Sequence, residues 1–280
     1  MAAVHDLTRM PRLGLALGGG GALGAAHVGV LQVLRERGIA PSIVAGTSAG
    51  AVVGAAYAVG LDPYDLEDHV VRASWSTFGT FTPRPGLGLL TADALRETVR
   101  TVAGDAAIED LPVTYGAVAT DAETRTATVL RSGPLADAIA ASIAVPGIFR
   151  PVSIGGRMLI DGGVVQNLPI ETAFDMGAEH VIGVRLAPEW ERLGGSELSV
   201  HEWAIRADVT LVQPVVGTHS QWVPRDLTAL VTEGRRAAEA VLADYPVVTP
   251  PPPREPPEDP PEDEEMPGPL RGIARFLHRY

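Results

Sequence analysis

The sequence of 280 residues contains no cysteine and no lysine, so all 22 of its basic residues are arginines. Without cysteine the chain has no disulfide, no thiolate metal site and no thiol nucleophile. Without lysine it has no Schiff-base chemistry, no Ser-Lys dyad and no phosphate-binding lysine of the kind that nucleotide hydrolases use. These two absences exclude several large classes of enzyme.

Positive charge is scarce as well. The formal net charge is −12, and no segment has the basic character of a nucleic-acid footprint, so we expect no nucleic-acid partner. Residues 1–12 lack the apolar core of a signal peptide. We therefore expect a cytoplasmic protein, with any membrane contact being peripheral and at the inner membrane surface.

Two uncharged runs, Leu13–Leu34 and Gly38–Leu61, reach the length of a membrane span. The second contains Gly46, Gly50 and Gly54 at the four-residue spacing of packed transmembrane helices. However, successive glycines interrupt the first run and a proline followed by turn-forming residues interrupts the second. Each interior glycine costs a helix about 1 kcal/mol. Both runs are better explained as a buried strand, a glycine turn and a helix.

Strands and helices alternate from the start of the chain. Residues 12–18 and 42–46 are short apolar runs that end in glycine, which is typical of strands buried on both faces. Each precedes a segment with helical character, Ala22–Arg37 and Ala49–Val59. This alternation predicts a three-layer α/β/α fold with a mainly parallel central sheet.

Further elements are expected along the rest of the chain. We expect helices over residues 62–73, 91–102, 134–144, 169–176, 199–212 and 228–243, and strands in "VTYGAVATD", "TRTATVLRSG", "RMLID" and residues 180–186. Residues 74–90 have no regular period but include Trp75, Phe78 and Phe81. We expect a long apolar loop there, either a lid or substrate wall or a loop tucked into the core.

The composition divides the chain into four parts. These are an N-terminal extension (1–11), one globular domain (12–245), a linker (246–270) and a short basic segment (271–280). The linker contains eleven prolines among acidic residues and is expected to be disordered. The last segment places apolar residues on one helical face beside three arginines. Such a segment could dock on a lipid surface or a partner, fray, or pack on the domain, and the sequence leaves these outcomes open.

The segment "GTSAG" places Ser48 between Gly46 and Gly50, at the junction of a predicted strand and a predicted helix. This is the G-x-S-x-G pattern of a nucleophile elbow, whose tight turn exposes the serine hydroxyl. The positive end of the following helix would stabilise a developing alkoxide. A turn of small residues also has purely structural uses, so the pattern alone makes Ser48 a candidate nucleophile.

Upstream, "GGGGALG" places consecutive backbone N–H groups at the start of a helix, where anions bind. It contains G-x-G-x-x-G as Gly19, Gly21 and Gly24, which would suit a dinucleotide-binding fold if an acidic residue followed the second strand. No acidic residue lies between Glu36 and Asp62, so we expect no nucleotide cofactor. Beside the elbow, the glycine loop is suited instead to stabilise an oxyanion.

A general base is still needed. In "LIDGG", Asp161 follows a buried strand and precedes Gly162 and Gly163. Burial raises the pKa of a carboxyl group and improves it as a proton acceptor. An alternative role for Asp161 is a turn-forming Asx motif, which Asp-Gly commonly makes.

A Ser-Asp-His triad is the alternative to a Ser-Asp pair. It would need His180, His201 or His219. His180 starts a predicted strand and suits a structural role, whereas spacing does not dismiss His219. The acidic residues are not arranged with a histidine at the spacing of metal ligands, so we expect no metal site.

Six elements follow one another along the chain: the glycine loop 18–24, "GTSAG", "TD" at 120–121, "ASIAVPGIFRPV" at 141–152, "DGGVVQNLP" at 161–169 and "MGAEHVIGV" at 176–184. This ordered set resembles the bacterial patatin-like phospholipase family over about residues 11–245. The resemblance implies a patatin-like hydrolase domain at residues 12–245, and a serine esterase that acts on lipid acyl esters with a Ser-Asp dyad and no catalytic histidine. It implies that Ser48 is the nucleophile and Asp161 the base, with the oxyanion region at Gly19, Gly20 and Gly21.

The chain departs from that family at Leu23, where the family usually has Arg or Lys before the last glycine of the loop. The backbone N–H groups of the loop can bind an oxyanion whatever the side chain at position 23. The departure therefore concerns the handling of an anionic lipid head group or the catalytic rate. Together with the acidic tail, it motivates a second hypothesis, a catalytically weak lipid-binding or regulatory protein on the same fold. Turnover of a lipid ester separates the two hypotheses.

Overall fold

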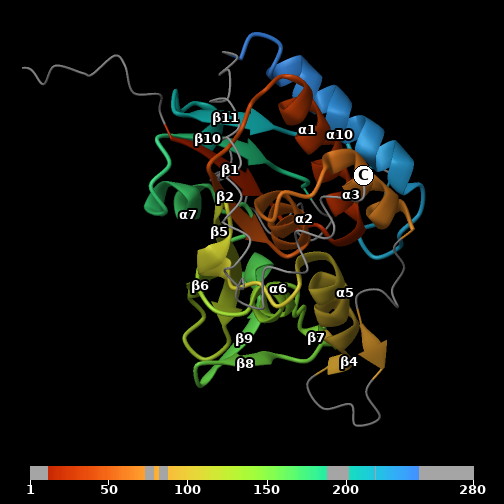
Figure 1. Cartoon of the computed structure of the whole chain (residues 1–280), viewed down its shortest axis with the longest axis vertical. Coiled ribbons are helices and arrows are strands. Elements are labelled where there is room, and N and C mark those ends of the chain that lie inside the picture. Colours follow the sequence, from red (N-terminus) through yellow and green to blue (C-terminus); the bar gives the residue numbers. More distant parts are fainter. Residues whose placement is uncertain (1–11, 73–78, 82–87, 188–201, 218, 246–280) are drawn as a thin grey trace, which may run out of the picture.

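An eight-stranded sheet runs through the centre of the molecule (Figure 1). The computed structural model describes residues 12–72, 79–81, 88–187, 202–217 and 219–245. The strand order is β11 (Val209–Val212), β10 (His180–Val184), β1 (Leu13–Leu17), β2 (Ile43–Thr47), β5 (Thr114–Asp121), β9 (Arg157–Asp161) and β8 (Val152–Ile154), with β6 (Ala127–Leu130) also paired to β5. Neighbours from β11 to β5 are parallel, whereas β6, β8 and β9 pair antiparallel.

The two central strands, β1 and β2, are apolar because helices cover both faces of the sheet. They pair in parallel, with Leu17 opposite Gly46, and nearly all their side chains are buried. Parallel neighbours end at the same edge of a sheet. The glycine loop, which follows β1, and Ser48, which follows β2, therefore emerge at the same edge.

The register of β9 brings Asp161 to that edge. Thr47 of β2 pairs with Val118 of β5, and the next residue of β5, Ala119, pairs with Asp161 of β9. β9 runs antiparallel to β5, and the residue of β9 that lies opposite Ala119 is its last one, Asp161. The register thus places the end of β9 level with the end of β2, with β5 between them.

Helices cover the two faces unequally (Figure 1). The larger core cluster draws side chains from α1 (Ala25–Glu36), α2 (Ala49–Ala58), α3 (Pro63–Val71), α5 (Asp93–Ala103), α6 (Leu135–Ser142) and α10 (Leu227–Val241). The smaller cluster involves α7 (Ile170–Asp175). Neighbouring residues of β1 alternate between the clusters, since Leu15 and Leu17 belong to the larger and Ala16 to the smaller. The expected α/β fold with a central sheet flanked by helices is confirmed.

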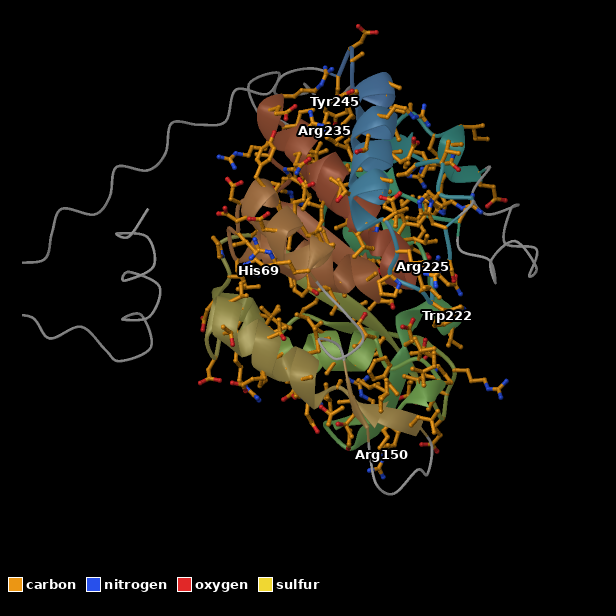
Figure 2. All side chains as sticks on the ribbon, turned by 90° about the vertical axis from the view of Figure 1, so that its right-hand side faces the viewer. His69, Arg150, Trp222, Arg225, Arg235 and Tyr245 are labelled. Atoms are coloured by element: carbon orange, nitrogen blue, oxygen red, sulfur yellow. The ribbon has the colours of Figure 1, made fainter. Side chains whose placement is uncertain are left out.

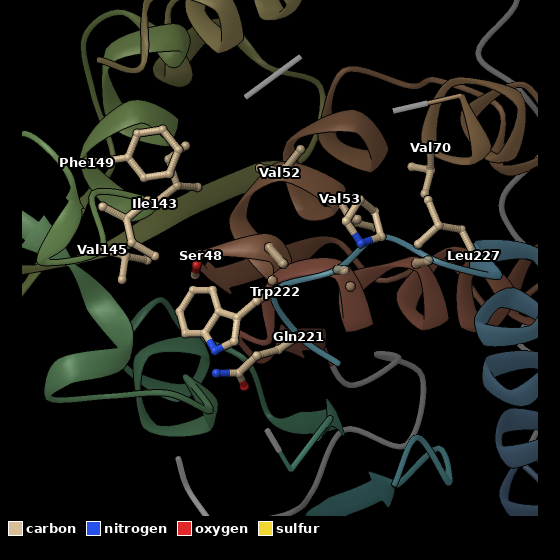
Figure 3. Close-up of a pocket in the computed structure, with 17 residues that line it drawn as sticks. Ser48, Val52, Val53, Val70, Ile143, Val145, Phe149, Gln221, Trp222 and Leu227 are labelled. Atoms are coloured by element: carbon tan, nitrogen blue, oxygen red, sulfur yellow. The ribbon is translucent and has the colours of Figure 1, made fainter. Parts of the chain in front are cut away.

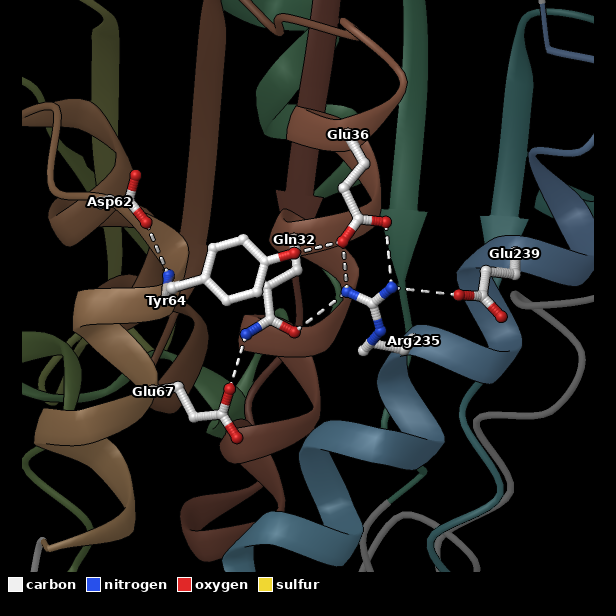
Figure 4. A network of polar contacts seen from close by, with 7 residues as sticks. All are labelled: Gln32, Glu36, Asp62, Tyr64, Glu67, Arg235 and Glu239. Atoms are coloured by element: carbon white, nitrogen blue, oxygen red, sulfur yellow. Dashed lines mark hydrogen bonds and ion pairs between the residues drawn. The ribbon is translucent and has the colours of Figure 1, made fainter.

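Polar contacts tie α1, α3 and α10 together at the surface (Figure 4). Arg235 of α10 donates to both carboxylate oxygens of Glu36 in α1, at 2.7 and 2.9 Å. Tyr64 of α3 donates its hydroxyl to the same carboxylate, and Gln32 donates to Glu67 at 2.7 Å. Arg235 first and Tyr64 second lower the pKa of Glu36 to about 2. These bonds fix how the three helices pack over the larger core.

Most predicted elements are confirmed within a few residues. Asp62 caps the helix predicted over 62–73, since its Oδ1 accepts the Tyr64 N–H at 2.9 Å and Pro63 is the first residue of α3. The strands predicted in "VTYGAVATD" and "TRTATVLRSG" form the β5–β6 hairpin. Shorter helical turns occupy η1 (Gly21–Gly24), η2 (Ile108–Asp110) and η3 (Gly162–Val164). Within the described ranges, no helix has both the length and the apolar character needed to cross a membrane.

Two predictions are wrong in part. The helix predicted over 199–212 ends before Val209–Val212, because these residues form β11 and complete the parallel edge beside β10. The loop predicted over 74–90 contains two short strands, β3 (Thr80–Phe81) and β4 (Gly88–Thr91), which pair with each other, and β4 also pairs with β7 (Gly147–Phe149).

β11 and β4 are stabilised by backbone pairing with strands far away in the sequence, β10 and β7. Gly88 makes one such contact possible, since an added Cβ would lie 2.4 Å from the backbone of Phe149. Several predictions concern parts outside the described residues: the side chains of Trp75, Phe78 and Phe81, and the segments 1–11, 246–270 and 271–280.

Candidate active site

Ser48 occupies a sharp turn between β2 and α2. Its backbone has φ 53° and ψ −120°, a conformation that residues with a side chain rarely adopt and that costs on the order of 1–3 kcal/mol. The flanking glycines allow the turn, because a Cβ on Gly46 would lie 2.4 Å from the Gly50 carbonyl oxygen and one on Gly50 would lie 2.1 Å from the Leu17 carbonyl oxygen. Ser48 thus lies in a tight turn between a strand and a helix and is 9% exposed.

Hydrogen bonds hold the backbone around Ser48. Its own N–H donates to Ser142 Oγ at 2.9 Å, and its carbonyl oxygen accepts from Ala51 at 2.8 Å. The N–H of Ala49, the first residue of α2, makes no hydrogen bond within the described residues. A free amide at a helix N-terminus, directly after the serine, is available to an anion.

Asp161 ends β9 with its carboxyl group buried and 6% of the residue exposed. Oδ1 accepts the Gly163 N–H at 2.7 Å, so the turn-forming role considered for Asp161 is present. Oδ2 is buried and has no hydrogen-bond partner among the described residues. One oxygen therefore anchors the turn, and the other remains available for a proton.

The pKa of the Asp161 carboxyl group is raised. Burial raises its pKa from 3.8 to about 6, while the nearby Ser48 hydroxyl and the hydrogen bond from the Gly163 N–H act in the opposite direction. The structure therefore brings Ser48 and Asp161 together. A carboxylate with a pKa near 6 is ionised at neutral pH and is a better base than an exposed one.

The glycine loop packs directly against the elbow. A Cβ on Gly19 would lie 3.2 Å from Ser48 Cβ, and one on Gly24 would lie 2.6 Å from Ala49 Cβ. The Gly19 N–H is already used, since it donates to the Asn167 carbonyl oxygen at 3.1 Å. The N–H groups of Gly20 and Gly21 make no hydrogen bond within the described residues. Of the three predicted oxyanion amides, two are thus free.

Sequence reasoning gave no role at the site to His27, a polar residue on the apolar face of α1. It is fully buried, and its Nε2 donates to the Gly18 carbonyl oxygen at 2.7 Å. Burial lowers the pKa of His27 to about 4, so the ring is neutral at physiological pH. A neutral imidazole here fixes the start of the glycine loop and adds no charge beside the site.

Two of the three histidines considered for a triad are among the described residues, and neither lines the pocket that contains Ser48. His180 bonds to Thr210 Oγ1 at 2.8 Å and meets Tyr245 edge to face. His219 donates its N–H to the Val216 carbonyl oxygen, and His201 lies outside the described residues. No histidine of the described residues lines the pocket that contains Ser48.

Ser48 opens into an apolar pocket of about 130 Å³ (Figure 3). Among the described residues of its lining, Gln221 is the one polar side chain with an amide or hydroxyl apart from Ser48. The apolar lining comes mainly from α2, α3, the segment after α6 and the segment before α10: Val52, Val53, Val70, Ile143, Val145, Ile148, Phe149, Trp222, Pro224 and Leu227. The described residues that line the pocket include no charged side chain, and such a lining suits a hydrocarbon chain.

The rim of the pocket reaches the surface near Trp222, which is 38% exposed. Trp222 and Arg225 lie on one face of the molecule (Figure 2). Leu23, the departure from the family pattern, is 1% exposed in the larger core cluster and does not line the pocket. The leucine therefore contributes to packing and presents nothing to a ligand in this pocket.

Comparison with known proteins identifies the family. The model described as "Patatin-like phospholipase" matches residues 15–174. An uncharacterized NTE family protein of Mycobacterium tuberculosis is 42% identical over 187 residues, which cover 63% of this chain and 49% of that protein. Patatin-like phospholipase domain-containing protein 6 of Mus musculus is 32% identical over 199 residues, which cover 66% of this chain and 15% of that protein. The chain thus spans about half the length of the mycobacterial relative and less of the mouse one.

A solved structure shares the fold. VipD from Legionella pneumophila aligns with a TM-score of 0.54 at 16% sequence identity, covering 84% of this chain and 67% of that one. At this identity the likeness concerns the fold alone. The family match covers more than half of the 280 residues and includes both Ser48 and Asp161. The chain belongs to the patatin-like phospholipase family.

Proposed function

We propose that the protein is a serine acyl hydrolase that cleaves lipid acyl esters through a dyad of Ser48 and Asp161. One observation carries this proposal. A buried carboxyl group with a pKa raised to about 6 and one unpartnered oxygen lies beside a serine in a strained turn, and that serine opens into an apolar pocket. Perturbed carboxyl groups and strained backbones both concentrate at functional sites.

In the first step, Asp161 accepts the hydroxyl proton of Ser48 while Oγ attacks the ester carbonyl carbon. The tetrahedral intermediate collapses, the ester bond breaks, and the alcohol leaves with the proton that Asp161 returns to it. In the second step, Asp161 accepts a proton from water, and the hydroxide attacks the acyl-enzyme. The fatty acid leaves and Ser48 regains its proton.

The free amides near Ser48 are the proposed oxyanion donors. Gly20 caps η1, Gly21 is the first residue of η1, and Ala49 begins α2, so these N–H groups lie at helix N-termini. Gly19 contributes differently, since its N–H is bonded to Asn167 and its lack of a side chain allows the close approach to Ser48. Each correctly placed donor lowers the barrier by on the order of 3 kcal/mol.

The substrate class follows from the pocket. Its lining of valine, isoleucine, leucine and aromatic side chains suits an acyl chain and offers no ion pair to a charged one. The partly exposed Trp222 at the rim and the exposed Arg225 on the same face support peripheral contact with a lipid surface, from which an acyl chain would enter (Figure 2).

The test is hydrolysis of a lysophospholipid and of a long-chain fatty-acyl ester by the intact chain. We expect turnover by the wild type, and loss of turnover in Ser48→Ala and in Asp161→Ala. His219→Ala serves as the matched control and keeps its activity. Turnover that survives Asp161→Ala and disappears in His219→Ala would replace the dyad with a triad.

The second candidate, a catalytically weak lipid-binding protein, predicts lipid binding by the wild type with no turnover of either ester. In the sequence this candidate is motivated by the acidic tail, which lies outside the described residues, and by Leu23. Because that side chain is buried in the core and does not line the pocket, no observation in the structure favours this candidate over the hydrolase.

A further inference from the structure

The C-terminal end of α6 contacts the backbone of both members of the proposed dyad. Ser142, the last residue of α6, accepts the Ser48 N–H at 2.9 Å. Two residues later, the Ala144 carbonyl oxygen accepts the Asp161 N–H at 2.9 Å. One short segment therefore binds the main chain at two positions that are far apart in sequence. These positions are Ser48 and Asp161, between which the proton passes in the proposed reaction.

The hydroxyl of Ser142 uses both its acceptor and its donor. While Oγ accepts from Ser48, it donates its own proton to the Val118 carbonyl oxygen at 2.6 Å. Ser142 is 0% exposed, so water does not compete for either bond. The Val118 carbonyl oxygen in turn packs against Gly162, where an added Cβ would lie only 2.2 Å away. The contacts thus run continuously from the nucleophile to the residue that follows Asp161.

Ser48 needs this support because its φ of 53° is unfavourable for a residue with a side chain. A hydrogen bond to its N–H fixes the peptide plane that enters the turn. The orientation of that plane determines where the hydroxyl points. A group held by several neighbours keeps the geometry that a reaction requires, whereas a loosely held one loses rate.

We propose that Ser142 is a positioning residue of this enzyme. Through the Ser48 amide, and together with the Ala144 carbonyl, it holds the nucleophile and the base at the separation that proton transfer requires. The proposal rests on the hydrolase function proposed above. The same segment continues into Ile143 and Val145, which line the pocket, so it also aligns the acyl chain with the dyad.

Three variants of the intact chain test this role. In Ser142→Ala we expect kcat to fall about 10- to 100-fold with little change in KM, because the defect lies in positioning and leaves the pocket lining intact. Ser142→Thr keeps the hydroxyl and recovers most of the loss. The matched control is Tyr115→Phe, which removes an equally buried hydroxyl that donates to the Ala51 carbonyl oxygen at 2.7 Å. Its kcat stays at the wild-type value.

Equal kcat in Ser142→Ala and Tyr115→Phe would overturn the proposal, as would a loss that a folded Ser142→Thr does not recover. Amide hydrogen exchange of the peptide containing Ser48 gives a second measurement that does not depend on turnover. We expect faster exchange at Ser48 in Ser142→Ala and wild-type exchange in Tyr115→Phe, and unchanged exchange in both would contradict the role of Ser142. A wild type without esterase turnover would contradict the hydrolase proposal instead, and the exchange measurement would then decide on Ser142 by itself.

Discussion

Gly19 and Ser48 pack so closely that a Cβ added to Gly19 would lie 3.2 Å from Ser48 Cβ and 2.6 Å from Asn167 Oδ1. Asn167 also accepts the Gly19 N–H through its carbonyl oxygen. A side chain at position 19 must therefore displace the elbow, the Asn167 side chain, or both. The loop and the nucleophile behave as one packed unit.

The first prediction concerns this contact. Gly19→Ala should lower kcat by about 100-fold, because a displacement of about 1 Å at a reacting group is enough for such a loss. Steady-state hydrolysis of a fatty-acyl ester measures it. Gly133→Ala is the control, since an added Cβ there meets no atom within 4 Å although the backbone φ is 86°. It should lose some stability but no activity, and a Gly19→Ala enzyme with wild-type kcat would show that the loop tolerates the side chain.

The pH dependence of turnover is the second prediction. Asp161 must be ionised to accept the Ser48 proton, and its pKa is raised to about 6 by burial. Activity should therefore be low at pH 4–5, rise as the pH passes about 6 and reach a plateau near neutrality. The acid limb of kcat/KM against pH measures this value in the free enzyme. A limb centred near pH 4, the ordinary range of an exposed carboxyl group, would rule out a buried Asp161 as the base.

The third prediction concerns stability. The pKa of Asp161 is raised in the folded state, so folding is penalised once the group must ionise, and this penalty develops as pH rises from about 4 to about 6. Asp161→Asn keeps an oxygen for the Gly163 N–H and removes the buried charge. We expect the variant to be inactive yet more stable than the wild type at pH 7, by on the order of 3 kcal/mol.

Urea unfolding at two pH values measures this difference. At pH 4 the wild-type carboxyl group is protonated in the folded state, and the two proteins should unfold at similar denaturant concentrations. An Asp161→Asn variant that is less stable than the wild type at pH 7 would mean that the carboxylate is stabilised in the fold, in conflict with the burial of Oδ2 without a partner.

The two groups proposed to react can be predicted from sequence patterns because they belong to short motifs. The turn at Ser48 needs Gly46 and Gly50 as its neighbours, and Asp161 needs the glycines that follow it, so each leaves a local signal. Ser142 also lies in one of the family elements, at 141–152, but the role proposed for it has no local signal, because it depends on a hydrogen bond to Ser48 across 94 positions of sequence. Only the paired register of β2, β5 and β9 brings these segments together.

The helices and strands also divide into those with a local sequence signal and those without one. Long helices and buried strands have clear periodicity, whereas the four residues of β11 and the short strands β3 and β4 depend on their partners in the sheet. His27 lies between these cases. A histidine on the apolar face of a helix was visible in the sequence, but its bond to the Gly18 carbonyl oxygen required the tertiary structure.

The fourth prediction concerns the pocket. Val53 lies in its lining near Val70 and Leu227, at some distance from Ser48 in Figure 3. Val53→Phe should fill this part of the pocket and shift the preference towards shorter acyl chains, which a series of esters from short to long chain length measures as kcat/KM. Val102→Phe, at an exposed position on α5, is the control and should leave the preference unchanged. The same profile in both variants would place the acyl chain elsewhere.

The most direct measurement is covalent labelling of the intact protein with a fluorophosphonate carrying an alkyl chain, followed by mass spectrometry of the peptides. We predict one adduct, on Ser48, that is absent in Ser48→Ala and forms far more slowly in Asp161→Asn. No adduct on a folded, lipid-binding wild type, or an adduct on another residue that persists in Ser48→Ala, would contradict it.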